Sequence, residues 1–192
     1  MRRTTLITAA AAALLLPATA RAQQAPTPPQ TFTLAATLLR GYQNLQRNLT
    51  EAAEKMPEAD YAFKPTAEVR PFGQLVAHVA LSQFGSCAAL KGDAAAPHKD
   101  EKEDAPRTKA QLVALLKEST AYCDPALTSL KDEDLTTLVK SGQNQGAKGL
   151  VLTGTNTHGN EVYGTMAVYL RLKGIVPPST ERQNQQMSKK SQ

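Results

Sequence analysis

The sequence predicts an all-α protein built as a four-helix bundle. Apolar residues recur at spacings of three and four along four segments, whereas the alternation typical of strands is nearly missing. Prolines and glycines follow the ends of these segments, as they do at helix termini. Four amphipathic helices bury their apolar stripes most simply against one another, so the pattern indicates a bundle.

The first two helices have clear limits. The first is predicted over residues 31–56, where one apolar stripe runs from Ala35 to Met56 and Pro57 stops it. The second is predicted over residues 71–90, because a proline is favoured in a first helical turn and Gly92 is a stop signal. A charged segment with little expected structure follows, over residues 92–107.

The third and fourth helices are separated by a long connection. The third begins near Thr108, and Pro125 is expected to kink or split it, with Asp124 capping the second piece. Residues 132–140 predict a short helix or turn, and the glycine-rich stretch 142–154 predicts a loop. The fourth helix is expected over residues 155–173. The long connections allow a crossover, so the order of the helices stays open at this point.

The two ends of the chain are expected to lie outside the bundle of residues 31–178. Residues 1–22 have a basic start, an apolar run and the small residues Ala20 and Ala22, which is the pattern of a cleaved signal peptide. Residues 23–30 predict a proline-rich tether, and residues 179–192 predict a disordered polar tail. We therefore expect export to the periplasm or the medium. Arg2 and Arg3 leave both the general and the twin-arginine export routes open.

Charge and hydropathy exclude two classes of partner. Removing the signal peptide lowers the net charge from +5 to +2, and no basic stripe with interleaved aromatic residues is present, so nucleic-acid binding is not expected. The apolar run of the signal peptide is too short for a permanent membrane span, and no later segment is long and apolar enough.

Cys87 and Cys123 are the only cysteines of the chain. In an oxidising compartment such a pair favours a disulfide. The alternative is two buried thiols that pack as small apolar groups.

Two of the three histidines fall where a site can form. His78 lies at the edge of the core-facing stripe of the second helix, and His158 precedes Glu161 by three residues, on the same face of the fourth helix. Histidine and glutamate at this spacing on facing helices are typical of metal sites in bundle cores. Buried, hydrogen-bonded histidines are the alternative. His98, in the charged segment, is expected to be a solvent-exposed bystander.

Several motifs together resemble those of the DinB-like family of four-helix bundles. They are FKP at residues 63–65, FGQLVAHVA at 72–80, HGNEVYG at 158–164 and YLRLKGIVPP at 169–178, and the resemblance covers most of residues 31–178. It implies helices in up-down-down-up order, often a homodimer, and a divalent metal held by three histidines.

The resemblance implies that His78 and His158 match the first two of these ligands. The third would fall at residue 162, where this chain has Val162, which has no donor atom. Two histidines bind zinc or nickel more weakly unless another group, such as Glu161, completes the site.

Two functions follow from this pattern. The first is a non-catalytic or vestigial bundle protein that binds a small molecule or a partner. The alternative is a divalent-metal-dependent hydrolase or transferase that uses His78 and His158.

Overall fold

The computed structural model describes residues 32–141 and 144–191. Its main helices are α1 (Leu34–Lys55), α2 (Phe72–Lys91), α3 (Lys109–Thr128) and α4 (Lys148–Leu172). Two 3-10 turns, η1 (Glu58–Asp60) and η2 (Asp132–Thr136), a hairpin of β1 (Leu138–Ser141) and β2 (Asn144–Ala147), and helix α5 (Pro178–Lys190) complete the described part. The predicted signal peptide and tether lie outside the described residues.

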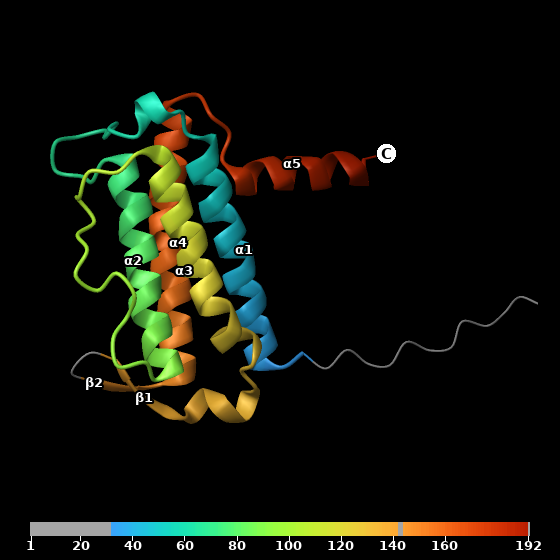
Figure 1. Ribbon diagram of the computed structural model, residues 1–192. Coiled ribbons are helices and arrows are strands. Elements are labelled where there is room, and N and C mark those ends of the chain that lie inside the picture. Colours follow the sequence, from blue (N-terminus) through green and yellow to red (C-terminus); the bar gives the residue numbers. More distant parts are fainter. Residues whose placement is uncertain (1–31, 142–143, 192) are drawn as a thin grey trace, which may run out of the picture. The chain divides into compact units, whose positions relative to one another are not determined.

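The four long helices form the predicted all-α bundle. α1 and α4 run in one direction, and α2 and α3 run in the other (Figure 1). Each helix packs on two neighbours, α1 on α3 and α4, and α2 on α3 and α4. The order is therefore up-down-down-up, with the hairpin and η2 forming the connection from α3 to α4 (Figure 1).

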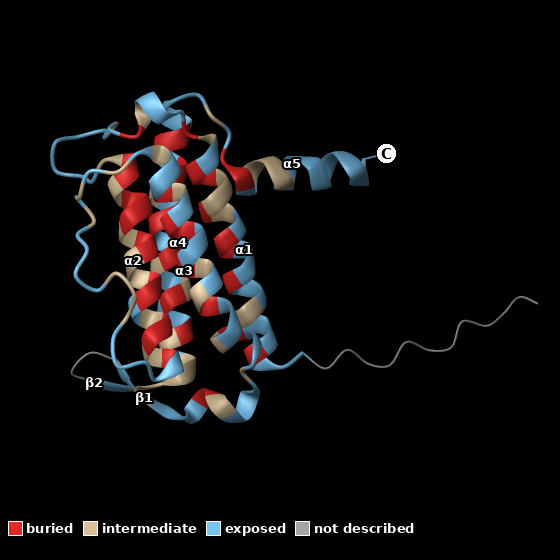
Figure 2. Cartoon of the chain, viewed as in Figure 1, coloured by how far each residue is buried: buried red, intermediate tan, exposed pale blue. Residues whose placement is uncertain are grey.

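Buried apolar residues from all four helices fill the space between them, while the outer faces are exposed (Figure 2). The helix ends have local causes. The Thr33 side chain accepts from the amide of Ala36 to cap α1, and Thr108 and Gln111 form a reciprocal capping box on α3. Gly92 ends α2 at a φ of 76°, a left-handed conformation that favours glycine.

α3 is one continuous helix, so Pro125 does not split it into two pieces. Proline removes one backbone donor, but Pro125 lies only in the last turn, where few hydrogen bonds depend on it. The neighbouring residues Cys123 and Leu127 are buried and hold this turn against the bundle. Asp124 lies inside the helix and caps nothing.

α4 begins at Lys148, seven residues before the predicted start, so the predicted loop over 142–154 is largely wrong. Leu152 and Thr155 are buried in this first part of the helix. A Cβ at Gly149 would lie 3.1 Å from the carbonyl oxygen of Leu135, so the glycine allows the helix to start close to η2. Glycine lowers helix propensity, but the packing of the buried residues Leu152 and Thr155 stabilises the helix in this segment.

The C-terminal segment forms α5 and not the disordered tail that its polar composition predicts. Pro178 occupies the first turn, Glu181 lies near the N-terminus, and Lys189 and Lys190 lie near the C-terminus, which complements the helix dipole. Its start is tied to α1: Lys55 lies 2.7 Å from Glu181, and Arg182 binds Glu51 and Asn48. Residues 183–190 are exposed (Figure 2).

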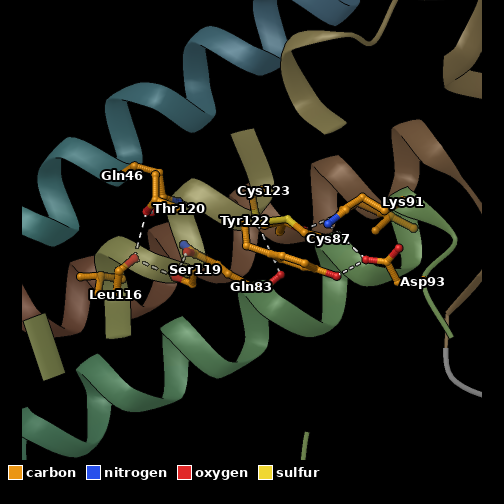
Figure 3. Close-up of a disulfide and its surroundings, with 12 residues drawn as sticks. Gln46, Gln83, Cys87, Lys91, Asp93, Leu116, Ser119, Thr120, Tyr122 and Cys123 are labelled. Carbon is orange, nitrogen blue, oxygen red and sulfur yellow. Dashed lines mark hydrogen bonds and ion pairs between the residues drawn. A yellow bond between two sulfur atoms is a disulfide. The ribbon is translucent and has the colours of Figure 1, made fainter. Parts of the chain in front are cut away.

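A disulfide joins Cys87 on α2 to Cys123 on α3, and both residues are fully buried (Figure 3). One turn away, Ser119 donates to Oε1 of Gln83 at 2.8 Å, and Thr120 donates to Oε1 of Gln46 at 3.0 Å. The disulfide therefore lies beside a buried polar layer that links α1, α2 and α3.

None of the described helices is long and apolar enough to cross a membrane.

Candidate functional site

The antiparallel packing of α2 and α4 brings His78 and His158 together. Their ring centroids are 4.9 Å apart, and the rings meet edge to face at 78°. Gly159, the next residue, lies against Leu45 of α1, where a Cβ would be 2.5 Å from Cδ2 of Leu45. The missing side chain therefore lets α4 pack closely on α1 beside His158.

The two histidines line a pocket of about 270 Å³. Its wall also contains Glu161 and Val162 from α4. The remaining lining residues are Glu68, Val69, Arg70, Leu75, Thr165 and Tyr169. Val162 is buried and contributes hydrocarbon to the wall, whereas Glu161 is exposed at its edge.

A further residue, Glu103, contacts the site from the α2–α3 link (residues 92–107). Oε2 of Glu103 lies 2.5 Å from Nδ1 of His78. Its other oxygen, Oε1, accepts from Nε of Arg70 at 2.7 Å and from Nε2 of Gln74 at 2.8 Å. This carboxylate therefore ties the link to α2 and fixes the orientation of the His78 ring.

Electrostatics keep Glu103 ionised. Burial alone would raise its pKa, but the hydrogen bonds from Arg70, His78 and Gln74 outweigh burial and hold the pKa below its usual value. A carboxylate only accepts hydrogen bonds, so Nδ1 of His78 carries a proton and donates it to this contact.

His158 is in a different electrostatic environment. Burial lowers its pKa, and the nearby His78 and Arg70 lower it further, against the opposing effect of Glu161. The ring is therefore neutral at neutral pH. Its Nε2 is buried, and no residue in the described part of the chain hydrogen-bonds to it.

The residues present do not fit a complete metal site. Within residues 32–141 and 144–191, no three His, Cys, Asp or Glu side chains are grouped so that they could hold a metal ion. His78, His158 and Glu161, the predicted ligand set, line the same pocket but are not such a group. Val162, where the family resemblance implies a third histidine, has no donor.

His98 differs from the predicted bystander. Its side chain is 24% exposed, Nδ1 lies 2.6 Å from Glu101, and Nε2 lies 3.0 Å from Glu118 on α3. It does not contribute to the pocket. The charged composition of its surroundings led to the expectation of exposure, but these charges pair with one another.

The sequence does not identify Glu103 as a site residue, for the same reason. It belongs to a run of acidic and basic residues, Lys99 to Asp104, which predicts a solvated segment. Nothing in its spacing relative to His78 indicates the contact, because 25 residues and a helix end separate the two.

Comparisons with known proteins give one family and several solved structures. The family model of the DinB superfamily matches residues 42–158, which include His78 and end at His158. No curated protein sequence matches. A DinB-like protein from Bacillus cereus is 16% identical, with a TM-score of 0.64 over 76% of this chain and 96% of its own.

Two further structures resemble the bundle. A DinB-like protein from Bacillus subtilis is 22% identical, with a TM-score of 0.59 over 72% of this chain and 92% of its own. A variant of mycothiol-dependent maleylpyruvate isomerase is 15% identical, with a TM-score of 0.54 over 67% of this chain and 60% of its own. At these identities the likeness concerns the fold.

Proposed function

The chain belongs to the DinB superfamily, and on that premise we propose that it is an exported bundle protein that binds a small polar molecule at His78 and His158 without a three-histidine metal centre. The pattern of residues 1–22 supports export to the periplasm or the medium. The family and the bundle support the site, because clefts between bundle helices are common ligand sites.

One observation carries the proposal: the buried Nε2 of His158 has no protein partner in the described part of the chain, although His158 lines the pocket. Leaving a buried polar atom unpaired costs about 1–3 kcal/mol, and such atoms occur at functional sites. A polar atom of a ligand that reached this nitrogen would complete the hydrogen bond. The pocket volume of about 270 Å³ limits the ligand to a small molecule.

The test uses the purified chain without a histidine tag. We expect substoichiometric zinc and nickel in the protein as isolated, and no tight uptake in a titration with either ion. A set of small carboxylates, amines and sugars is then screened by NMR, and a binder should shift the ring signals of His78 and His158. A stoichiometric metal that is lost in His78→Ala would overturn the proposal.

The variant Val162→His provides a second test of the proposed function. If the scaffold has the family geometry and lacks only a donor, this variant should bind zinc at micromolar concentration or tighter, whereas the natural chain should not. The matched control is Val168→His, which adds a histidine to an exposed position of the same helix. Equal zinc binding by both variants would contradict the assignment of residue 162 as the position of the family's third metal ligand.

The alternative is a divalent-metal-dependent hydrolase or transferase that uses His78 and His158. Glu103 favours it, because metal-binding histidines commonly donate their other ring N–H to a carboxylate. One structural neighbour of the bundle is a mycothiol-dependent maleylpyruvate isomerase, which also supports this alternative. Because the protein donors form no group of three in the described part of the chain, we derive no metal-dependent step.

A further inference from the structure

His98 connects the α2–α3 link to α3. Its Nδ1 lies 2.6 Å from Oε1 of Glu101 on the link, and its Nε2 lies 3.0 Å from Oε1 of Glu118 on α3. Carboxylates only accept hydrogen bonds, so both ring nitrogens must donate, and this is possible only in the protonated imidazolium. The geometry therefore describes the positively charged form of His98.

The other groups around this ring are paired or apolar. From α2 the ring meets Phe84, with centroids 4.8 Å apart. The second oxygen of Glu101 accepts from Arg107 at 2.5 Å. Beyond Phe84, Tyr122 of α3 donates to Asp93, which also pairs with Lys91 of α2 at 3.2 Å. Glu101 and Glu118 are thus the charged groups that contact the His98 ring directly.

The backbone at His98 has an uncommon conformation. Its φ is 56°, and it is the one non-glycine residue in the described part of the chain with a positive φ. This left-handed conformation is unfavourable for a residue with a Cβ unless its surroundings hold it. Removing either glutamate contact therefore favours a different path for the link.

Glu103 connects the link to His78, a residue of the pocket wall. It follows Glu101 by two residues and binds Arg70, Gln74 and Nδ1 of His78. A link that leaves α3 at His98 and Glu118 also loosens the segment that carries this carboxylate. His78 would then lose the group that fixes its ring.

We propose that the α2–α3 link is a proton-operated strap, in which protonated His98 bridges Glu101 and Glu118 and so keeps Glu103 on His78. When the proton leaves for water, the ring keeps one N–H and one of the two bridges is lost. The proposal rests on the proposed function in that it takes the pocket at His78 and His158 as the ligand site.

The direction of the pH response follows from the two glutamates. Their hydrogen bonds to the ring raise the pKa of His98 above its ordinary value of 6.5, against a smaller opposing effect of burial. The strap should therefore be closed in acidic solution and open as the pH rises through the raised pKa of His98.

Hydrogen exchange measured by mass spectrometry tests the strap in the full chain without ligand. Between about pH 5.5 and about pH 9, after correction for intrinsic exchange, peptides covering residues 94–106 should lose protection by about tenfold. His98→Gln and Glu118→Gln should be unprotected throughout. The matched control, Lys99→Gln, removes an exposed link charge that pairs with Asp100 and should behave like the natural chain.

NMR of the His78 ring tests the coupling to the pocket. The Nδ1–H signal of His78 should disappear as the link opens, and it should be missing in His98→Gln at every pH. Equal link protection in the natural chain and in both variants would overturn the strap. A link that opens while this signal persists would overturn the coupling. Neither measurement involves a ligand, so failure of the pocket to bind one is a separate result.

Discussion

Because Nε2 of His158 has no partner in the described chain, we expect this histidine to lower the free energy of unfolding. Replacing His158 by Leu removes a buried polar atom without a partner in the described chain and should raise the free energy of unfolding by about 1 kcal/mol. Urea denaturation measures this change. The same substitution at His78 should instead destabilise by about 1 kcal/mol, because it leaves Glu103 with one partner fewer. A destabilised His158→Leu variant would show that this histidine is structural.

His98 predicts a pH-dependent contribution to stability. Because its pKa is higher in the folded chain than the ordinary value of 6.5, the folded state holds the proton more tightly. The contribution is complete below about pH 6.5 and disappears as pH rises through the raised pKa. The natural chain should therefore be more stable than His98→Gln in acidic solution, and the difference should vanish in alkaline solution. A pH series of urea midpoints measures it, with Lys99→Gln as the control.

At the scale of elements, the contact of α1 with α4 depends on Gly159. A Cβ there would approach Cδ2 of Leu45, which is 1% exposed and has little space to move. Gly159→Val should therefore destabilise by about 1–3 kcal/mol through overpacking, and His158 should shift with the helix. Gly164→Val on the open face of α4 is the control, since a Cβ at Gly164 would have no neighbour within 4 Å in the described chain. Thermal unfolding of both variants measures whether only Gly159→Val destabilises the protein.

The helices that the sequence predicts well have both a stripe and a stop signal. α1 and α2 agree with prediction within a few residues, because Pro57, Pro71 and Gly92 limit their apolar patterns. α4 starts earlier than predicted because burial of Leu152 overrides a glycine-rich composition. α5 lacks a stripe altogether and is tied to α1 by Lys55 and Arg182, contacts that no local pattern reveals.

In the candidate site, too, the residues on regular helices were predictable from the sequence, and the residues on the irregular link were not. Helical spacing and the family resemblance indicated that His78 and His158 meet, because each lies at a defined position of a predicted helix. Glu103 and His98 lie on an irregular link, where periodicity carries no information about direction. Their partners, Arg70 and Glu118, are identified only by the path of that link through space.

At the scale of the whole molecule, the Cys87–Cys123 disulfide stabilises the side of the bundle that carries the link. It spans 36 residues, and the loop-entropy account gives roughly 3–4 kcal/mol for a loop of this size. The double variant Cys87→Ser and Cys123→Ser should lose about that free energy of unfolding. Thiol counting in denaturant should find no free thiol in the natural chain before reduction and two after it. Two thiols without reductant would contradict the bridge.

The same bond makes residues 87–123 a covalent ring, and the α2–α3 link lies inside it. A protease that cuts after Lys99, which is 60% exposed, would therefore leave two fragments joined through sulfur. The cut protein would migrate as one species in non-reducing electrophoresis and as two after reduction. His98 would lie beside the new end of the first fragment, while Glu103 would belong to the second and still contact Arg70 and Gln74. A single cut would thus separate His98 from the part of the strap that contacts His78, without releasing either fragment.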